Sequence, residues 1–118
     1  MFCEHIGSAD REIVCLLALD VNNTVIGVTV VSIGTLNGAP IHPREVFKPA
    51  ILLNAATVII GHNHVSGVLE PSDDDIETTK RLIQAGRILG IEVLDHIIVN
   101  EDGQHLSLKK KMNGYWGC

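Results

Sequence analysis

Short apolar runs separated by polar stretches predict that strands and helices alternate along the chain. Residues Ile13–Leu19 form one apolar run, and the β-branched segment Val25–Ile33 follows after a turn at residues 20–23. Asparagine at that turn tolerates left-handed backbone, so we expect the two strands to pair as a hairpin. A third strand is expected over residues 57–61, whose continuous apolar character is typical of a strand that is buried on both faces.

Two helices are expected to separate these strands from the rest of the sheet. The first begins at Pro43, which suits an opening helical turn with Glu45 close behind, and it extends to about Asn54. The second follows Ser72, a favourable N-cap residue, and we expect Gly90 to end it. Its apolar residues recur at helical spacing and are Ile76, Leu82, Ile83, Gly86 and Leu89.

The remaining pattern predicts two more strands, over Glu92–Val99 and residues 104–108, joined by a turn near Gly103. Loops are expected over residues 34–40 and 62–71. The order β-β-α-β-α-β-β therefore predicts an α/β fold, in which helices pack on a central mixed sheet through right-handed crossovers.

Composition indicates one globular domain over residues 1–118. An apolar fraction of 46% excludes a disordered or fibrous chain, and no run is long enough to span a membrane. The N-terminal residues show no secretion signal, so we expect a soluble cytoplasmic protein. The cysteines (Cys3, Cys15 and Cys118) are too few and too far apart for a disulfide framework, and Cys15 is expected in the core.

The charge balance argues against an extensive nucleic-acid surface on this domain. The formal net charge is −5, and the basic run Lys109, Lys110 and Lys111 is too short to offset it. We expect these lysines to be solvated, and we expect no strong nucleic-acid binding by this domain alone.

The candidate chemistry lies in the stretch GHNHVSGVLEPSDDD. His62 and His64 come directly after the third predicted strand, where residues two apart point to the same side, and Asp75 begins the second helix. Two imidazoles and one carboxylate are the ligand types of a catalytic Zn²⁺ site, which keeps a fourth position open for water. In this interpretation the Ser72 hydroxyl donates a hydrogen bond to an oxyanion, although helix capping explains Ser72 equally well.

These residues resemble the JAMM (MPN-plus) metalloprotease pattern, which is His-x-His, seven residues, Ser, two residues and Asp. The flanking blocks REIVCLLALD, GTLNGAPIHPRE, LNAATVIIGHNH, PSDDDIETTKRL and LGIEVLDHIIV are similar to the RadC-type branch of that family. The resemblance extends over about residues 10–108.

The resemblance implies a three-layer α/β/α sandwich, related in architecture to the cytidine deaminases. It implies zinc bound by His62, His64 and Asp75, with Glu12 as the general base that activates water. The implied reaction is hydrolysis of a peptide or isopeptide bond in a peptide or protein substrate. The branch is also associated by name with DNA repair, and its relatives carry an N-terminal helix-hairpin-helix segment that we expect this chain to lack.

One position departs from the family pattern. Val65 stands where the family usually has proline, which changes the loop but removes no ligand.

Three other functions compete with hydrolysis. A catalytically idle binding module with a role in DNA repair is the main alternative, and the intact ligand set favours the hydrolase. A deaminase would need His-x-Glu and Pro-Cys-x-x-Cys motifs, which the chain does not contain. A single ligand cluster and net acidity disfavour a metal-dependent nuclease.

Overall fold

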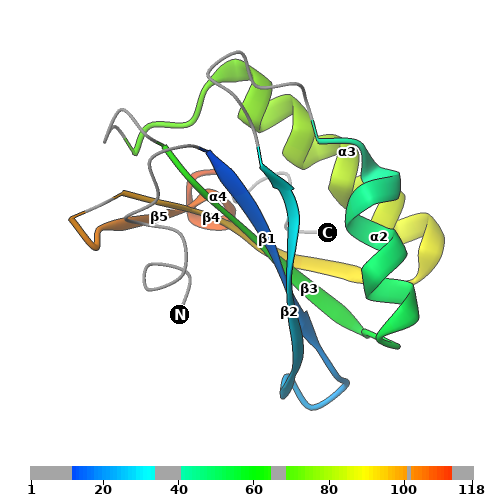
Figure 1. Ribbon diagram of the computed structural model, residues 1–118. Coiled ribbons are helices and arrows are strands. Elements are labelled where there is room, and N and C mark those ends of the chain that lie inside the picture. The colour runs from blue at the N-terminus through cyan, green and yellow to red at the C-terminus, as the bar shows by residue number, and fades with distance from the viewer. Residues whose placement is uncertain (1–11, 34–40, 65–68, 101, 113–118) are drawn as a thin grey trace.

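In the part of the chain that the structure describes, five strands form one mixed sheet in the order β2-β1-β3-β4-β5 (Figure 1). The computed structural model describes residues 12–33, 41–64, 69–100 and 102–112. The strands are β1 (Ile13–Leu19), β2 (Val25–Ile33), β3 (Thr57–Asn63), β4 (Glu92–Val99) and β5 (His105–Ser107). Strands β3 and β4 pair in parallel, and the other neighbouring pairs are antiparallel. The expected hairpin and mixed sheet are therefore confirmed.

In the described ranges three helices accompany the sheet: α2 (Pro43–Leu52), α3 (Asp73–Leu89) and α4 (Leu108–Lys111). Helix α3 begins and ends as predicted, because Ser72 is its N-cap and Gly90 adopts a left-handed φ of 74° at its C-cap. The His42 side chain caps α2 by accepting a hydrogen bond from the Arg44 N–H at 3.2 Å. Within the described ranges, no helix has the length and apolar character needed to cross a bilayer.

Among the described residues, two apolar clusters lie on opposite faces of the sheet. The first joins both long helices to the sheet and includes Val14, Leu16, Ala18, Val46, Phe47, Ala50, Leu82 and Ile83. The second is centred on Cys15, Leu17, Leu19 and Val99. Cys15 is a core residue, as expected. In the described ranges the second cluster contains strand residues alone, so these ranges show one of the two helical layers that the resemblance implies.

Helix α3 lies close to the start of β4 because Gly86 has no side chain. A Cβ atom at Gly86 would stand 2.4 Å from the Ile91 carbonyl oxygen, far inside van der Waals contact. The Ile91 N–H also donates to the Gly86 carbonyl at 2.9 Å. This contact fixes the turn in which α3 ends and β4 begins.

Several predicted boundaries were wrong. Helix α2 ends at Leu52 instead of continuing to Asn54, which takes a positive φ of 57°. Strand β3 extends through His62 and Asn63, where a loop was expected. Residues 65–68 of that loop lie outside the described residues, as does the whole loop that was expected over residues 34–40.

The final strand is also shorter than predicted, since β5 stops at Ser107 and Leu108 begins α4. Asp95 on β4 stabilises this change of direction by accepting from the Ser107 hydroxyl at 2.6 Å and from the Lys109 N–H at 3.1 Å. Leu108 is fully buried in the first cluster. The apolar pattern alone gave no sign of α4, because its start depends on a side chain from another strand.

Candidate metal centre

The two histidines of the candidate site lie at the carboxyl end of β3. His62 belongs to the strand and is buried, and His64 follows it by two residues. The His64 N–H donates to the Val99 carbonyl at 3.1 Å, so the chain stays extended beside β4 past the formal end of β3. This extension holds the two imidazoles near each other, with ring centroids 4.8 Å apart.

Asp75 reaches the histidines from the first turn of α3. A capping box fixes this turn, because the Ser72 N–H donates to Asp75 Oδ2 at 2.9 Å and the Asp75 N–H donates to Ser72 Oγ at 3.1 Å. The carboxylate is thereby oriented by its own helix start. The expected N-cap role of Ser72 is confirmed.

The geometry of these side chains fits a small divalent cation. His62 Nε2 lies 3.5 Å from Asp75 Oδ1, and His64 Nε2 lies 3.0 Å from Asp75 Oδ2. Ligand atoms of a tetrahedral zinc site stand about 3.3 Å apart when the bonds to zinc are about 2.0–2.1 Å. One ligand atom from each residue can be chosen so that all lie within 4.8 Å of one another. The His64 and Asp75 side chains are 12% and 20% exposed, which leaves an approach from solvent.

The protonation states also suit metal ligands. Burial lowers the pKa of His62 to about 4; the Asp75 carboxylate opposes this shift and His64 adds to it. Burial alone would raise the pKa of Asp75, but the hydrogen bond with His64, the nearby His62 and the Ser72 N–H hold that pKa well below its usual value. At neutral pH His62 is therefore neutral and Asp75 is ionised, as cation binding requires.

The structure places His96 directly behind His62. Its Nε2 lies 2.7 Å from His62 Nδ1, and its Nδ1 lies 2.6 Å from the Thr79 hydroxyl. His96 is buried, and burial holds its pKa well below the usual value, with His62 adding to the shift and Asp75 opposing it. Sequence reasoning missed this contact, because the two histidines lie 34 positions apart on different strands.

Glu12 directly precedes β1, at the same end of the sheet as His62 and His64. Val14 pairs with His62 in the antiparallel ladder between β1 and β3, and continuing this register by two residues brings Glu12 opposite His64. Residues directly opposite in such a pair project from the same face of the sheet. The Ile13 N–H donates to Asn63 Oδ1 at 2.6 Å, which fixes the backbone next to Glu12. Glu12 is half-buried and does not belong to the ligand group.

Other glutamates that could compete with Glu12 for the role of general base lie elsewhere in the described part of the chain. Glu70 forms an ion pair with Lys111 at 2.7 Å, and Glu45 belongs to the first turn of α2. Glu77 is exposed on α3, two residues past Asp75 and so about 200° around the helix axis. Glu4 and Val65 lie outside the described residues.

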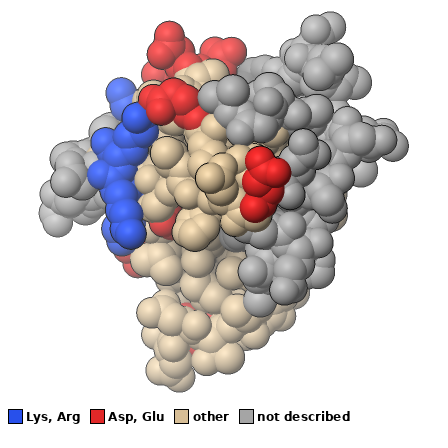
Figure 2. Space-filling model, turned by 90° about the vertical axis from the view of Figure 1, so that its left-hand side faces the viewer, with Lys and Arg blue, Asp and Glu red and all other residues tan. Residues whose placement is uncertain are grey.

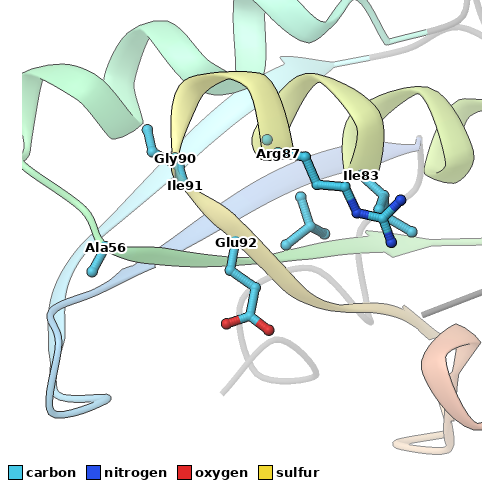
Figure 3. Close-up of a pocket in the computed structure, with 8 residues that line it drawn as sticks. Ala56, Ile83, Arg87, Gly90, Ile91 and Glu92 are labelled. Atoms are coloured by element: carbon cyan, nitrogen blue, oxygen red, sulfur yellow. The ribbon is translucent and has the colours of Figure 1, made fainter. Parts of the chain in front are cut away.

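A separate pocket lies at the opposite end of α3, where the helix turns into β4 (Figure 3). Its lining residues are Ala56, Ile83, Gly86, Arg87, Gly90, Ile91, Glu92 and Val93. Arg87 follows Asp75 by 12 positions on the same helix, which corresponds to about 18 Å at 1.5 Å per residue. The pocket is therefore not part of the candidate metal centre.

Comparison with known proteins identifies the family of the chain and several of its relatives. A family model described as the RadC-like JAB domain matches residues 1–114. A UPF0758 protein of Caldanaerobacter subterraneus subsp. tengcongensis is 47% identical over 116 residues, which are 98% of this chain and 48% of the relative. UPF0758 proteins of Finegoldia magna and Methanococcoides burtonii are 50% and 48% identical, over 95% and 86% of this chain and 50% and 44% of their own lengths. The chain spans about half the length of these relatives.

Proposed function

This chain belongs to the RadC-like JAB domain family, and we propose that it is a zinc-dependent hydrolase of peptide or isopeptide bonds. The observation that carries the proposal is the convergence of His62, His64 and Asp75 from a strand end and a helix start. This ligand set is the one that catalytic zinc sites use when one position is kept for water or substrate. The substrate in this proposal is a peptide or protein.

Zinc held by these residues would supply a Lewis acid that lowers the pKa of a bound water and polarises a substrate carbonyl. The chain supplies the remaining functions. His62 and His64 offer imidazole nitrogens as ligands, and the Asp75 carboxylate offsets part of the positive charge. His64 and Asp75 are only partly buried, which leaves one side open to a substrate carbonyl. The buried rings of His62 and His96 lie behind them.

Glu12 is proposed as the general base of this reaction. Its position opposite His64 in the register supports the role, because a base must lie beside the attacking water without occupying a ligand position. The carboxylate takes a proton from the water and delivers it to the leaving amine. Asn63 contributes indirectly, since its hydrogen bond to the Ile13 N–H holds the backbone that carries Glu12.

Ser72 is proposed to stabilise the oxyanion that forms on the substrate carbonyl. Its oxygen already accepts from the Asp75 N–H in the capping box. A hydroxyl both accepts and donates, so capping leaves the Ser72 proton available for a second contact. Ser72 is exposed and lies at the same helix start as Asp75, which supports access to substrate.

Zinc analysis combined with a peptidase screen tests the proposal. Purified protein should contain one zinc per chain and cleave some members of a peptide and isopeptide library. A chelator should remove this turnover, and added zinc should restore it. Zinc-loaded protein that cleaves nothing in a broad library would favour the alternative, a catalytically idle binding module with a role linked to DNA repair.

Weak binding to duplex DNA is also expected for this domain. In the view of Figure 2 the basic side chains form one narrow strip, with acidic side chains beside it and elsewhere on the same face. The net charge of −5 adds a general repulsion from phosphates. A fluorescence titration with a labelled duplex at physiological salt should give no submicromolar affinity. Tight binding that weakens steeply with added salt would contradict this expectation.

A further inference from the structure

A chain of hydrogen bonds runs behind the metal centre from His62 back to the backbone of Asp75. It passes from His62 on β3 to His96 on β4, and then to Thr79 on α3, which lies above both strands (Figure 1). The Thr79 hydroxyl closes the chain with a contact of 2.7 Å to the Asp75 carbonyl oxygen. His96 and Thr79 are 1% and 0% exposed, so water does not compete for these contacts.

The direction of each hydrogen bond follows from the groups involved. A carbonyl oxygen carries no hydrogen, so Thr79 must donate its single hydroxyl proton to the Asp75 carbonyl. Thr79 therefore accepts at its other contact, and the hydrogen between Thr79 and His96 belongs to His96 Nδ1. One backbone carbonyl thus determines which nitrogen of a buried imidazole is protonated.

The same reasoning extends to His62. The ring nitrogens of His96 contact one imidazole and one hydroxyl, and burying a charged ring with such partners is unfavourable. A neutral His96 that is protonated at Nδ1 has a lone pair at Nε2, which accepts from His62 Nδ1. A neutral His62 protonated at Nδ1 then has its lone pair at Nε2, the atom that lies 3.5 Å from Asp75 Oδ1.

We propose that Thr79 and His96 are positioning residues that hold His62 in the tautomer whose Nε2 lone pair faces the metal centre. The inference rests on the metal centre of the proposed function and extends it to two residues that touch neither metal nor substrate. The series of hydrogen bonds also ends at the Asp75 backbone. It therefore connects one imidazole ligand to the helix turn that supplies the carboxylate ligand.

Replacing Thr79 by valine tests the proposal, because valine has nearly the same shape and lacks the hydroxyl. Without that acceptor, a proton on His96 Nδ1 has no hydrogen-bond partner. The His96 tautomer protonated at Nε2 is then favoured instead. His96 would then donate to His62 Nδ1, which places the His62 proton on Nε2, in the way of the metal. Zinc affinity should fall about 10–100-fold, as is typical when the outer partner of a ligand is lost.

Thr79→Ser keeps the hydroxyl and should retain the wild-type affinity. Thr78→Val is the matched control, since Thr78 is buried on the same helix and takes no part in the hydrogen-bond chain. Zinc affinity is measured by competition with a chromophoric chelator. Equal affinities for Thr79→Val and Thr78→Val would overturn the proposal.

Nitrogen-15 NMR of the metal-free full chain gives a readout that is independent of zinc. The wild type and Thr79→Ser should show both His62 and His96 protonated at Nδ1, and Thr79→Val should lose this pattern. Wild-type His62 protonated at Nε2 would overturn the proposal, even if Thr79→Val fails to fold. If the wild type binds no zinc, the proposed function fails at its metal centre, while the tautomers still decide whether Thr79 and His96 set the His62 ring.

Discussion

Replacing Glu12 by glutamine is expected to remove most hydrolysis while leaving zinc content at the wild-type level. The amide has nearly the size of the carboxylate, so the start of β1 should fold unchanged. An amide does not accept a proton at neutral pH, and the attacking water is then no longer activated. We expect turnover of a substrate found by screening to fall about 10²–10⁴-fold, the range for a lost general acid–base group.

Glu77→Gln is the matched control for this variant. Glu77 is exposed on α3 close to Asp75 in sequence and points away from the ligands, so its loss should leave turnover unchanged. Both variants are compared with the wild type by zinc analysis and by steady-state kinetics on the same substrate. Wild-type turnover in Glu12→Gln would exclude Glu12 from the mechanism and return attention to the other carboxylates.

Asp75→Ala should abolish stoichiometric zinc binding. The substitution removes one of the three protein ligands, so the loss of affinity should exceed the 10–100-fold typical of an outer partner. It also removes the acceptor for the Ser72 N–H, and loss of this half of the capping box should cost on the order of 0.5–2 kcal/mol of stability. Zinc per chain is measured by elemental analysis after dialysis, and circular dichroism follows the fold.

Asp74→Ala is the control for Asp75→Ala. It distinguishes the loss of a zinc ligand from the loss of a negative charge at the start of α3. Asp74 is exposed in the same helical turn and lies outside the ligand group. Its loss should weaken the favourable interaction with the helix dipole by about 0.3–1 kcal/mol and leave zinc binding intact. Full zinc occupancy in a folded Asp75→Ala protein would show that the metal centre is wrongly assigned.

The features predicted well from the sequence depend on residues that are close together along the chain. The limits of β1, β2 and β4 followed from apolar runs, and the limits of α3 followed from Ser72 and Gly90. The meeting of the three candidate ligand side chains could be predicted for the same reason. His62 and His64 share a strand end, and Asp75 lies at a helix start that its neighbour Ser72 defines.

The position of Glu12 beside the candidate ligands could not be predicted from local sequence patterns. By sequence alone it was one of several acidic residues, and resemblance to a family selected it. In the folded chain the register between β1 and β3 brings it opposite His64, while Glu70 pairs with Lys111 and Glu77 faces away from the ligands. Register depends on how two strands align over their whole length, which no short window of sequence contains.

The hydrogen-bond chain behind His62 was decided by tertiary structure alone. The sequence places His96 in a predicted strand and Thr79 in a predicted helix, with no sign that their side chains meet. Their contacts require the parallel register of β3 and β4 and the close approach of α3 that Gly86 permits. The His62–His96 and Thr79–His96 hydrogen bonds, at 2.7 Å and 2.6 Å, depend on how separate elements pack together. Hydrophobic periodicity in the sequence shows only which side of each element is buried.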